Sequence, residues 1–123
     1  MTTQQIRTGR TENGEQMAVI EYCELKGITA VHIPNEGKRS ARYGATLKRM
    51  GLRKGFPDLF FPYARQGYHG LFIELKEGIS KKPTQDQLEW IARLNKNGYY
   101  ATVCYGADAA IAEINEYFEG GKR

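Results

Sequence analysis

The stretch GFPDLFF at residues 55–61, together with LFIELK at residues 71–76, decides the fold predicted for this chain, because each is a short apolar run typical of a buried strand. Side chains alternate between the two faces of a strand, so Phe72, Glu74 and Lys76 should point the same way. The opposite face carries only aliphatic residues: Leu71, Ile73 and Leu75. Glu74 and Lys76 should therefore lie side by side on a strand that a buried face holds in place.

Asp58 is the second acid of this region and enters its own strand directly after Pro57. From the next strand it could converge with Glu74, and two converging carboxylates either repel each other or hold a cation. Mg²⁺ and Mn²⁺ take such oxygen ligands and activate water against phosphate esters. Lys76 would stabilise charge on the attacked phosphate, and the carbonyl of Leu75 would be a further ligand. Singly, Asp58 also fits a turn former, and Glu74 with Lys76 fits a solvated cross-strand pair.

The other elements predicted along the chain flank these two strands. We expect an α/β fold whose mixed sheet is flanked by helices in the order α-β-β-β-α-β-α. The expected helices are 12–26, about 84–97 and 107–118, and the expected strands are 28–33, 58–62, 70–77 and 99–105. With 123 residues, 41% of them hydrophobic, the chain suits one domain over 12–119, with polar ends at 1–11 and 120–123.

The first helix offers a third acid. Thr11 or Asn13 is its predicted cap, and Gly27 is its predicted end. Glu15 shares a helix face with apolar residues three, four and seven positions onward, so it should point inward. We therefore expect Glu15 to be the helix-borne ligand, with Glu12, one turn earlier, as the alternative. An acid that only stabilises the helix N-terminus is the structural explanation.

A basic segment runs directly into Gly55. It contains seven cations and no acid, within a chain of net charge +4. Such a segment binds DNA phosphates in a salt-dependent way, although a solvated loop has the same composition. The predicted nucleic-acid contacts are these cations and one preceding turn residue: Asn35, Lys38, Arg39, Arg42, Lys48, Arg49, Arg53 and Lys54.

Several other polar residues have simpler structural explanations. Thr84 and Gln87 form the pattern of a capping box at the start of a helix. His32 and His69 have no second histidine or cysteine at metal spacing, so we expect structural or solvent-facing roles. The two cysteines, Cys23 and Cys104, are far apart and fit buried free thiols.

The whole pattern resembles the VRR-NUC (virus-type replication-repair nuclease) branch of the PD-(D/E)xK superfamily. The resemblance covers most of the chain and rests on EQ at 15–16, HIPN at 32–35, GFPD at 55–58, ELK at 74–76, Gln87, and the later Leu94 and GY at 98–99. It implies a restriction-endonuclease-like core in which Glu15, Asp58 and Glu74 serve the metal and Lys76 serves catalysis. It also implies that Gln87 lies near the active site.

The function expected from these residues and this resemblance is metal-dependent hydrolysis of DNA phosphodiesters. The resemblance implies selectivity for branched or junction DNA, a role in replication, recombination or repair, and a homodimer, and it leaves open whether the origin is phage or host. The rivals are a DNA-binding module with a silent site and an interaction protein whose acid–lysine cluster is structural. No apolar run approaches a membrane span, and no secretory signal or organic-cofactor motif is visible, so we expect a cytoplasmic protein.

Overall fold

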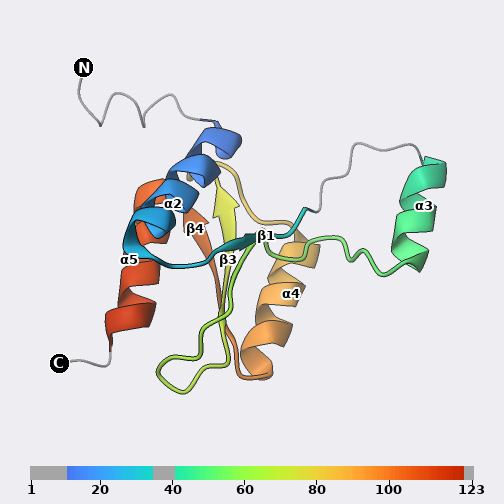
Figure 1. Cartoon of the computed structure of the whole chain (residues 1–123). Coiled ribbons are helices and arrows are strands. Elements are labelled where there is room, and N and C mark those ends of the chain that lie inside the picture. Colours follow the sequence, from blue (N-terminus) through green and yellow to red (C-terminus); the bar gives the residue numbers. More distant parts are fainter. Residues whose placement is uncertain (1–10, 35–40, 121–123) are drawn as a thin grey trace.

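A four-stranded mixed sheet forms the centre of the molecule (Figure 1). The computed structural model describes residues 11–34 and 41–120. The strands are β1 (Val31–His32), β2 (Leu59–Phe61), β3 (Leu71–Lys76) and β4 (Tyr100–Tyr105), and they lie in this order across the sheet. The pairs β1–β2 and β2–β3 are antiparallel, whereas β3–β4 is parallel, so the predicted mixed sheet is confirmed.

Helices cover both faces of this sheet (Figure 1). Helices α2 (Glu12–Lys26) and α5 (Ala107–Glu119) pack on one face, and α4 (Gln85–Lys96) packs on the other. Helix α3 (Ala41–Arg49), which carries part of the basic segment, stands apart from the sheet. No helix in the described part of the chain is long and apolar enough to cross a membrane.

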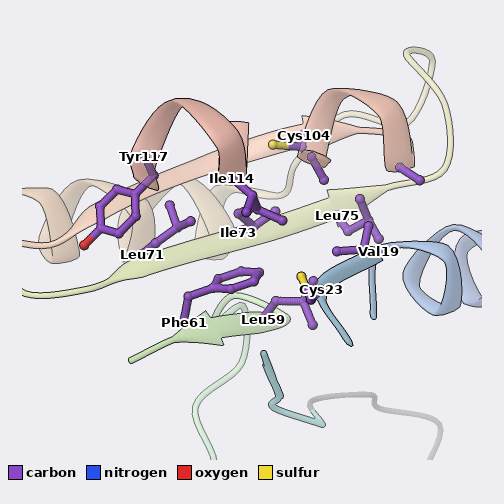
Figure 2. Close-up of a cluster of buried hydrophobic side chains, with 12 residues drawn as sticks. Val19, Cys23, Leu59, Phe61, Leu71, Ile73, Leu75, Cys104, Ile114 and Tyr117 are labelled. Atoms are coloured by element: carbon purple, nitrogen blue, oxygen red, sulfur yellow. The ribbon is translucent and has the colours of Figure 1, made fainter. Parts of the chain in front are cut away.

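The alternation predicted for the central strand is confirmed by two separate apolar clusters. Side chains of β2 and β3 meet α2 and α5 in the larger cluster, as Figure 2 shows: Val19, Cys23, Leu59, Phe61, Leu71, Ile73, Leu75 and Ile114. Phe72 points to the other face, where it packs with Leu94 and Ala101 beneath α4. Strand β3 is therefore buried on both faces, which fixes the direction of Glu74.

The helix ends predicted from the sequence are also confirmed. The side chain of Thr11 accepts a hydrogen bond from the Gly14 N–H (3.1 Å), and Gly27 ends α2 in the left-handed conformation at φ 74°. Thr84 and Gln87 form the reciprocal capping box at the start of α4. The two cysteines are free and buried, and burial raises the pKa of the Cys104 thiol to about 12.

Strand β1 is much shorter than predicted. Only two of the six residues expected in a strand over 28–33 pair with β2, at Val31↔Phe60 and His32↔Leu59. Residues 28–30 turn beneath the core instead, where Ile28 packs on the larger cluster and the Thr29 N–H donates to the Tyr63 hydroxyl (2.8 Å). The residues of this run are exposed or only partly buried, and the Ile28 N–H donates to the Cys23 carbonyl (2.8 Å), so these hydrogen bonds lie outside the strand ladder.

Candidate metal centre and its surroundings

Three carboxylates from three different elements converge at the C-terminal end of β3. They belong to Glu12 at the start of α2, Asp58 just before β2, and Glu74 in β3, and one oxygen of each lies within 4.8 Å of the others. The sequence predicted the convergence of Asp58 with Glu74. The structure adds Glu12, the alternative helix residue, as the third member.

Backbone geometry fixes the position of Asp58. The Leu75 N–H donates to Asp58 Oδ2 at 2.9 Å, and the Asp58 carbonyl accepts from the Ile33 N–H at 2.7 Å. The amide of Leu75 therefore faces this site. The N–H and C=O of one strand residue point to the same side, so the Leu75 carbonyl also points toward the Asp58 side of β3. Its role as a metal ligand stays a prediction.

Lys76 lies against the carboxylate of Glu74, as the strand alternation predicted. Its Nζ is 3.7 Å from Glu74 Oε2, and its side chain is largely enclosed. The lysine thus places one positive charge beside three acids. This charge compensates only part of the repulsion within the cluster.

Burial and repulsion from neighbouring carboxylates favour the protonated form of Glu74. Glu74 is 3% exposed, and burial together with the charge of Asp58 raises its pKa from 4.5 to about 8, against the opposing effect of Lys76. Burial also raises the pKa of Asp58, although the Leu75 N–H and Lys76 lower it in part. The pKa of Glu12 is raised as well, first by burial and then by Asp58. All three acids are thus destabilised as anions when no cation lies between them.

The donor set fits a hard divalent cation. Glu74 Oε1 is buried and has no hydrogen-bond partner among the described residues. An unsatisfied carboxylate oxygen in a buried position is costly, and a cation between the carboxylates would satisfy it and remove their repulsion. Carboxylate oxygens that leave room for water match the ligand preference of Mg²⁺ and Mn²⁺.

Glu15 does not join the acidic cluster, contrary to the sequence prediction. It is buried, at 5% exposed, as its position beside apolar residues indicated. However, its Oε1 accepts a hydrogen bond of 2.7 Å from the Ala107 N–H at the start of α5. The N-cap residue of α5, Gly106, has no side chain to cap the helix, so Glu15 supplies the cap from α2. The carboxylate one turn earlier, Glu12, lies in the acidic cluster instead.

Gln87 connects the acidic cluster to the capping box, so it lies where both explanations considered from the sequence would place it. Its Nε2 donates to Glu74 Oε2 at 3.0 Å, while its Oε1 accepts from the Thr84 N–H at 2.8 Å. Gly55 allows α4 to approach this closely. A Cβ on Gly55 would lie 2.7 Å from the backbone carbon of Asp86, and its φ of 87° is unfavourable for other residues.

A pocket of about 260 Å³ opens over the cluster. His32 lines it and is exposed, as the predicted solvent-facing role requires, and Asn13 and Gln16 line it as well. The pairing of His32 with Leu59 carries the histidine beside Asp58, and no local pattern reveals this register. His69 lies elsewhere, edge-on to Tyr99 at 5.5 Å.

The predicted DNA-contacting residues are only partly described. Lys48 and Arg49 are exposed in the last turn of α3, and Arg53 and Lys54 are exposed in the segment that leads to Gly55. Arg42 lies in α3, but its side chain is not described. Asn35, Lys38 and Arg39 lie outside the described residues. The described part of the basic segment thus presents exposed cations along the chain that leads to Asp58.

Comparison with known proteins agrees with this arrangement. A mixed sheet lies between helices, and Asp58, just before β2, meets Glu74 and Lys76 of the central strand β3, which is the arrangement that the resemblance to the PD-(D/E)xK class implied. The sequence model of the VRR-NUC domain matches residues 10–108, and the chain belongs to this nuclease family.

Two solved structures are similar to this chain. One, named a VRR-NUC domain protein, is 34% identical with a TM-score of 0.81, and the match covers 90% of each chain. Another, named a VRR-NUC domain, covers 89% of this chain and 100% of its own, with 24% identity and a TM-score of 0.62, and it supports the fold alone. A search of curated proteins found no match.

Proposed function

We propose that this protein is a divalent-metal-dependent endonuclease that hydrolyses DNA phosphodiester bonds in the cytoplasm. One observation carries the proposal: Glu12, Asp58 and Glu74 place carboxylate oxygens within 4.8 Å of one another, and Lys76 lies 3.7 Å from Glu74. This combination of oxygen ligands and one fixed cation is suited to phosphoryl chemistry. Membership of a nuclease family supports the same reaction.

Each residue of the site would have its own role in metal binding, phosphate contact or positioning. Glu12, Asp58 and Glu74 would hold Mg²⁺ or Mn²⁺, with the Leu75 carbonyl as a further ligand; the bound ion would supply a more acidic water and neutralise phosphate charge. Lys76 would bind a phosphate oxygen or orient the attacking water. Gln87 would hold the Glu74 carboxylate in one orientation through its hydrogen bond.

The preferred DNA would be branched. Cutting both strands of a junction needs two active sites, so we propose a homodimer that acts in replication, recombination or repair. The exposed cations Lys48, Arg49, Arg53 and Lys54 would bind the backbone beside the cleaved phosphate. Light scattering of the purified protein, with and without DNA, tests the dimer independently of cleavage.

Cleavage assays test the reaction itself. Labelled duplex, single-stranded, flap and four-way-junction DNA are incubated with Mg²⁺ or Mn²⁺, and in parallel with EDTA. Wild type should cut at least one form, and EDTA should stop it. Lys76→Ala should slow cutting by roughly 10²–10⁴-fold while DNA binding persists. Lys96→Ala is the matched control, because Lys96 is an exposed lysine in the last turn of α4, at the opposite end of that helix from Gln87.

The alternative is a DNA-binding module whose acidic site does not catalyse cleavage. The exposed cations of the 48–54 segment favour it as much as they favour a nuclease. If wild type binds every DNA form but cuts none in either metal, the alternative replaces the proposal.

A further inference from the structure

An apolar cavity of about 240 Å³ lies beside the metal centre and has no role in the mechanism above. It is formed where the exit of β1, the turn after α3 and the middle of α4 meet. Seven residues line it, and only one of them is charged: Ile33, Pro34, Gly51, Leu52, Arg53, Phe56 and Trp90.

Two aromatic rings, nearly perpendicular to each other, line this cavity. Phe56 and Trp90 are edge-to-face with centroids 5.0 Å apart, and Phe56 also contacts Phe72 at 5.4 Å in the smaller core cluster. The guanidinium of Arg93 covers the Trp90 ring at 4.7 Å. Trp90 is therefore held in place by α4 and the core, although it remains half-buried and lines open space.

Short backbone connections link the cavity to the metal centre. Phe56 lies two residues before Asp58, and the Ile33 N–H donates to the Asp58 carbonyl at 2.7 Å. On α4, Trp90 lies three residues after Gln87, which bonds Glu74. Residues three apart on a helix lie on neighbouring parts of the same face. A nucleotide next to the reacting phosphate could therefore reach this cavity.

The charge around the cavity matches a nucleotide. Arg53 lines it, and Lys48, Arg49 and Lys54 are exposed on the same segment. Two acids, Asp86 and Glu89, line the adjoining pocket on the other side of Trp90, and Asp86 lies 3.8 Å from the Lys54 ammonium. An apolar, aromatic interior beneath a cationic rim suits a flat base attached to a phosphate backbone.

We propose that this cavity receives an unpaired nucleobase of the DNA strand whose phosphate lies at the metal centre. The inference rests on the proposed nuclease function and specifies its substrate as DNA with unpaired nucleotides beside the cut. A base stacked within a duplex cannot enter the cavity, whereas an unpaired base can rotate out at low cost. Stacking on an aromatic side chain contributes enough to distinguish an unpaired base from a paired one.

Intrinsic fluorescence tests this directly, because Trp90 is the only tryptophan in the chain. The full chain is titrated in EDTA with a blunt duplex, with the same duplex bearing a short single-stranded extension, and with that extension made of abasic nucleotides. The unpaired bases should quench Trp90 and tighten binding by about 5- to 150-fold over the abasic probe. Equal quenching and affinity for the base-containing and abasic extensions would show phosphate binding alone and would overturn the proposal.

Variants separate the base contact from general binding. Trp90→Phe should keep most of the preference for unpaired bases, and Trp90→Ala should lose it, as followed by anisotropy of labelled DNA. Leu88→Ala is the matched control, because Leu88 is exposed on the same helix and lies outside the cavity lining. Leu52→Asp provides a second test, because it puts a negative charge in the cavity from the opposite side and leaves α4 unchanged. An unaltered preference in both Trp90→Ala and Leu52→Asp would contradict the proposal.

The metal-free assay keeps this inference distinct from catalysis. If wild type cuts DNA but unpaired bases leave Trp90 unquenched, the cavity proposal fails and the nuclease proposal stands. If unpaired bases quench Trp90 but no DNA is cut, base binding stands and the nuclease proposal fails.

Discussion

Glu74→Gln should stabilise the metal-free protein at alkaline pH while abolishing its response to divalent metal. In the fold, Glu74 keeps its proton until about pH 8, whereas its ordinary pKa is 4.5. Between these two values the native state binds more protons than the unfolded state, so the free energy of unfolding falls as pH rises. A carboxyl group whose pKa is raised in the fold therefore lowers the free energy of unfolding above pH 4.5, and the full decrease is reached above pH 8.

The size of this effect follows from the pKa difference. Each pH unit within the window changes the free energy of unfolding by about 1.4 kcal/mol. Between pH 5 and pH 8, Glu74 should thus remove on the order of 4 kcal/mol from the metal-free wild type. Gln has nearly the same shape and can still accept the hydrogen bond from Gln87, but it carries no charge. The variant should lose this pH dependence.

Urea unfolding in EDTA at several pH values measures the difference. Wild type should lose stability toward pH 8, and Glu74→Gln should be the more stable protein there. Mg²⁺ at 100 times its dissociation constant should then restore about 2.7 kcal/mol to wild type and nothing to the variant. Glu24→Gln, an exposed acid on α2, is the control and should behave as wild type. Parallel pH profiles for wild type and Glu74→Gln would refute the reasoning.

Three sets of substitutions test the acidic cluster, the approach of α4 and the exposed cations of α3. Glu12→Gln should raise the Mn²⁺ concentration needed for cleavage at least 10-fold. Glu15→Gln should leave this concentration unchanged but lower the urea midpoint of unfolding, because the substitution weakens the hydrogen bond to the Ala107 N–H at the start of α5. Gly55→Ala should cost about 1–3 kcal/mol and slow cleavage, since its Cβ would push against the backbone beside Gln87. Replacing Lys48 and Arg49 by Gln should lower the slope of log affinity against log salt by about 2 if each binds one phosphate.

Each of these three predictions has a result that would contradict it. An unchanged Mn²⁺ requirement in Glu12→Gln, with a raised one in Glu15→Gln, would restore Glu15 as the ligand. A Gly55→Ala protein of wild-type stability would mean that α4 does not depend on close approach at this glycine. An unaltered salt slope would place the DNA backbone away from the end of α3.

The features that the sequence predicted correctly depend on local geometry. The alternation along β3 puts Glu74 and Lys76 on one face, and the capping box follows from the spacing of Thr84 and Gln87. Asp58 required the family resemblance in addition, because its approach to Glu74 depends on the pairing of β2 with β3. These signals lie within a few residues or within one strand pair.

The features that the sequence did not reveal depend on packing between distant segments. Glu12 and Glu15 lie one turn apart on α2, and only the position of α5 determines that Glu15 caps Ala107. His32 enters the pocket through its register with β2, and Trp90 meets Phe56 only because Gly55 lets α4 approach. Helix periodicity gave the inward direction of Glu15 correctly but could not identify what lies inside.

Binding of Mn²⁺, followed by electron paramagnetic resonance at pH 8, tests the central claim most directly. The account predicts that wild type, Glu24→Gln and Lys76→Ala bind Mn²⁺, and that Asp58→Asn and Glu74→Gln lose this site. Lys76→Ala should thus bind the ion but cut DNA much more slowly than wild type. Mn²⁺ binding that is equally strong in Asp58→Asn, Glu74→Gln and wild type would show that these carboxylates are not a metal centre.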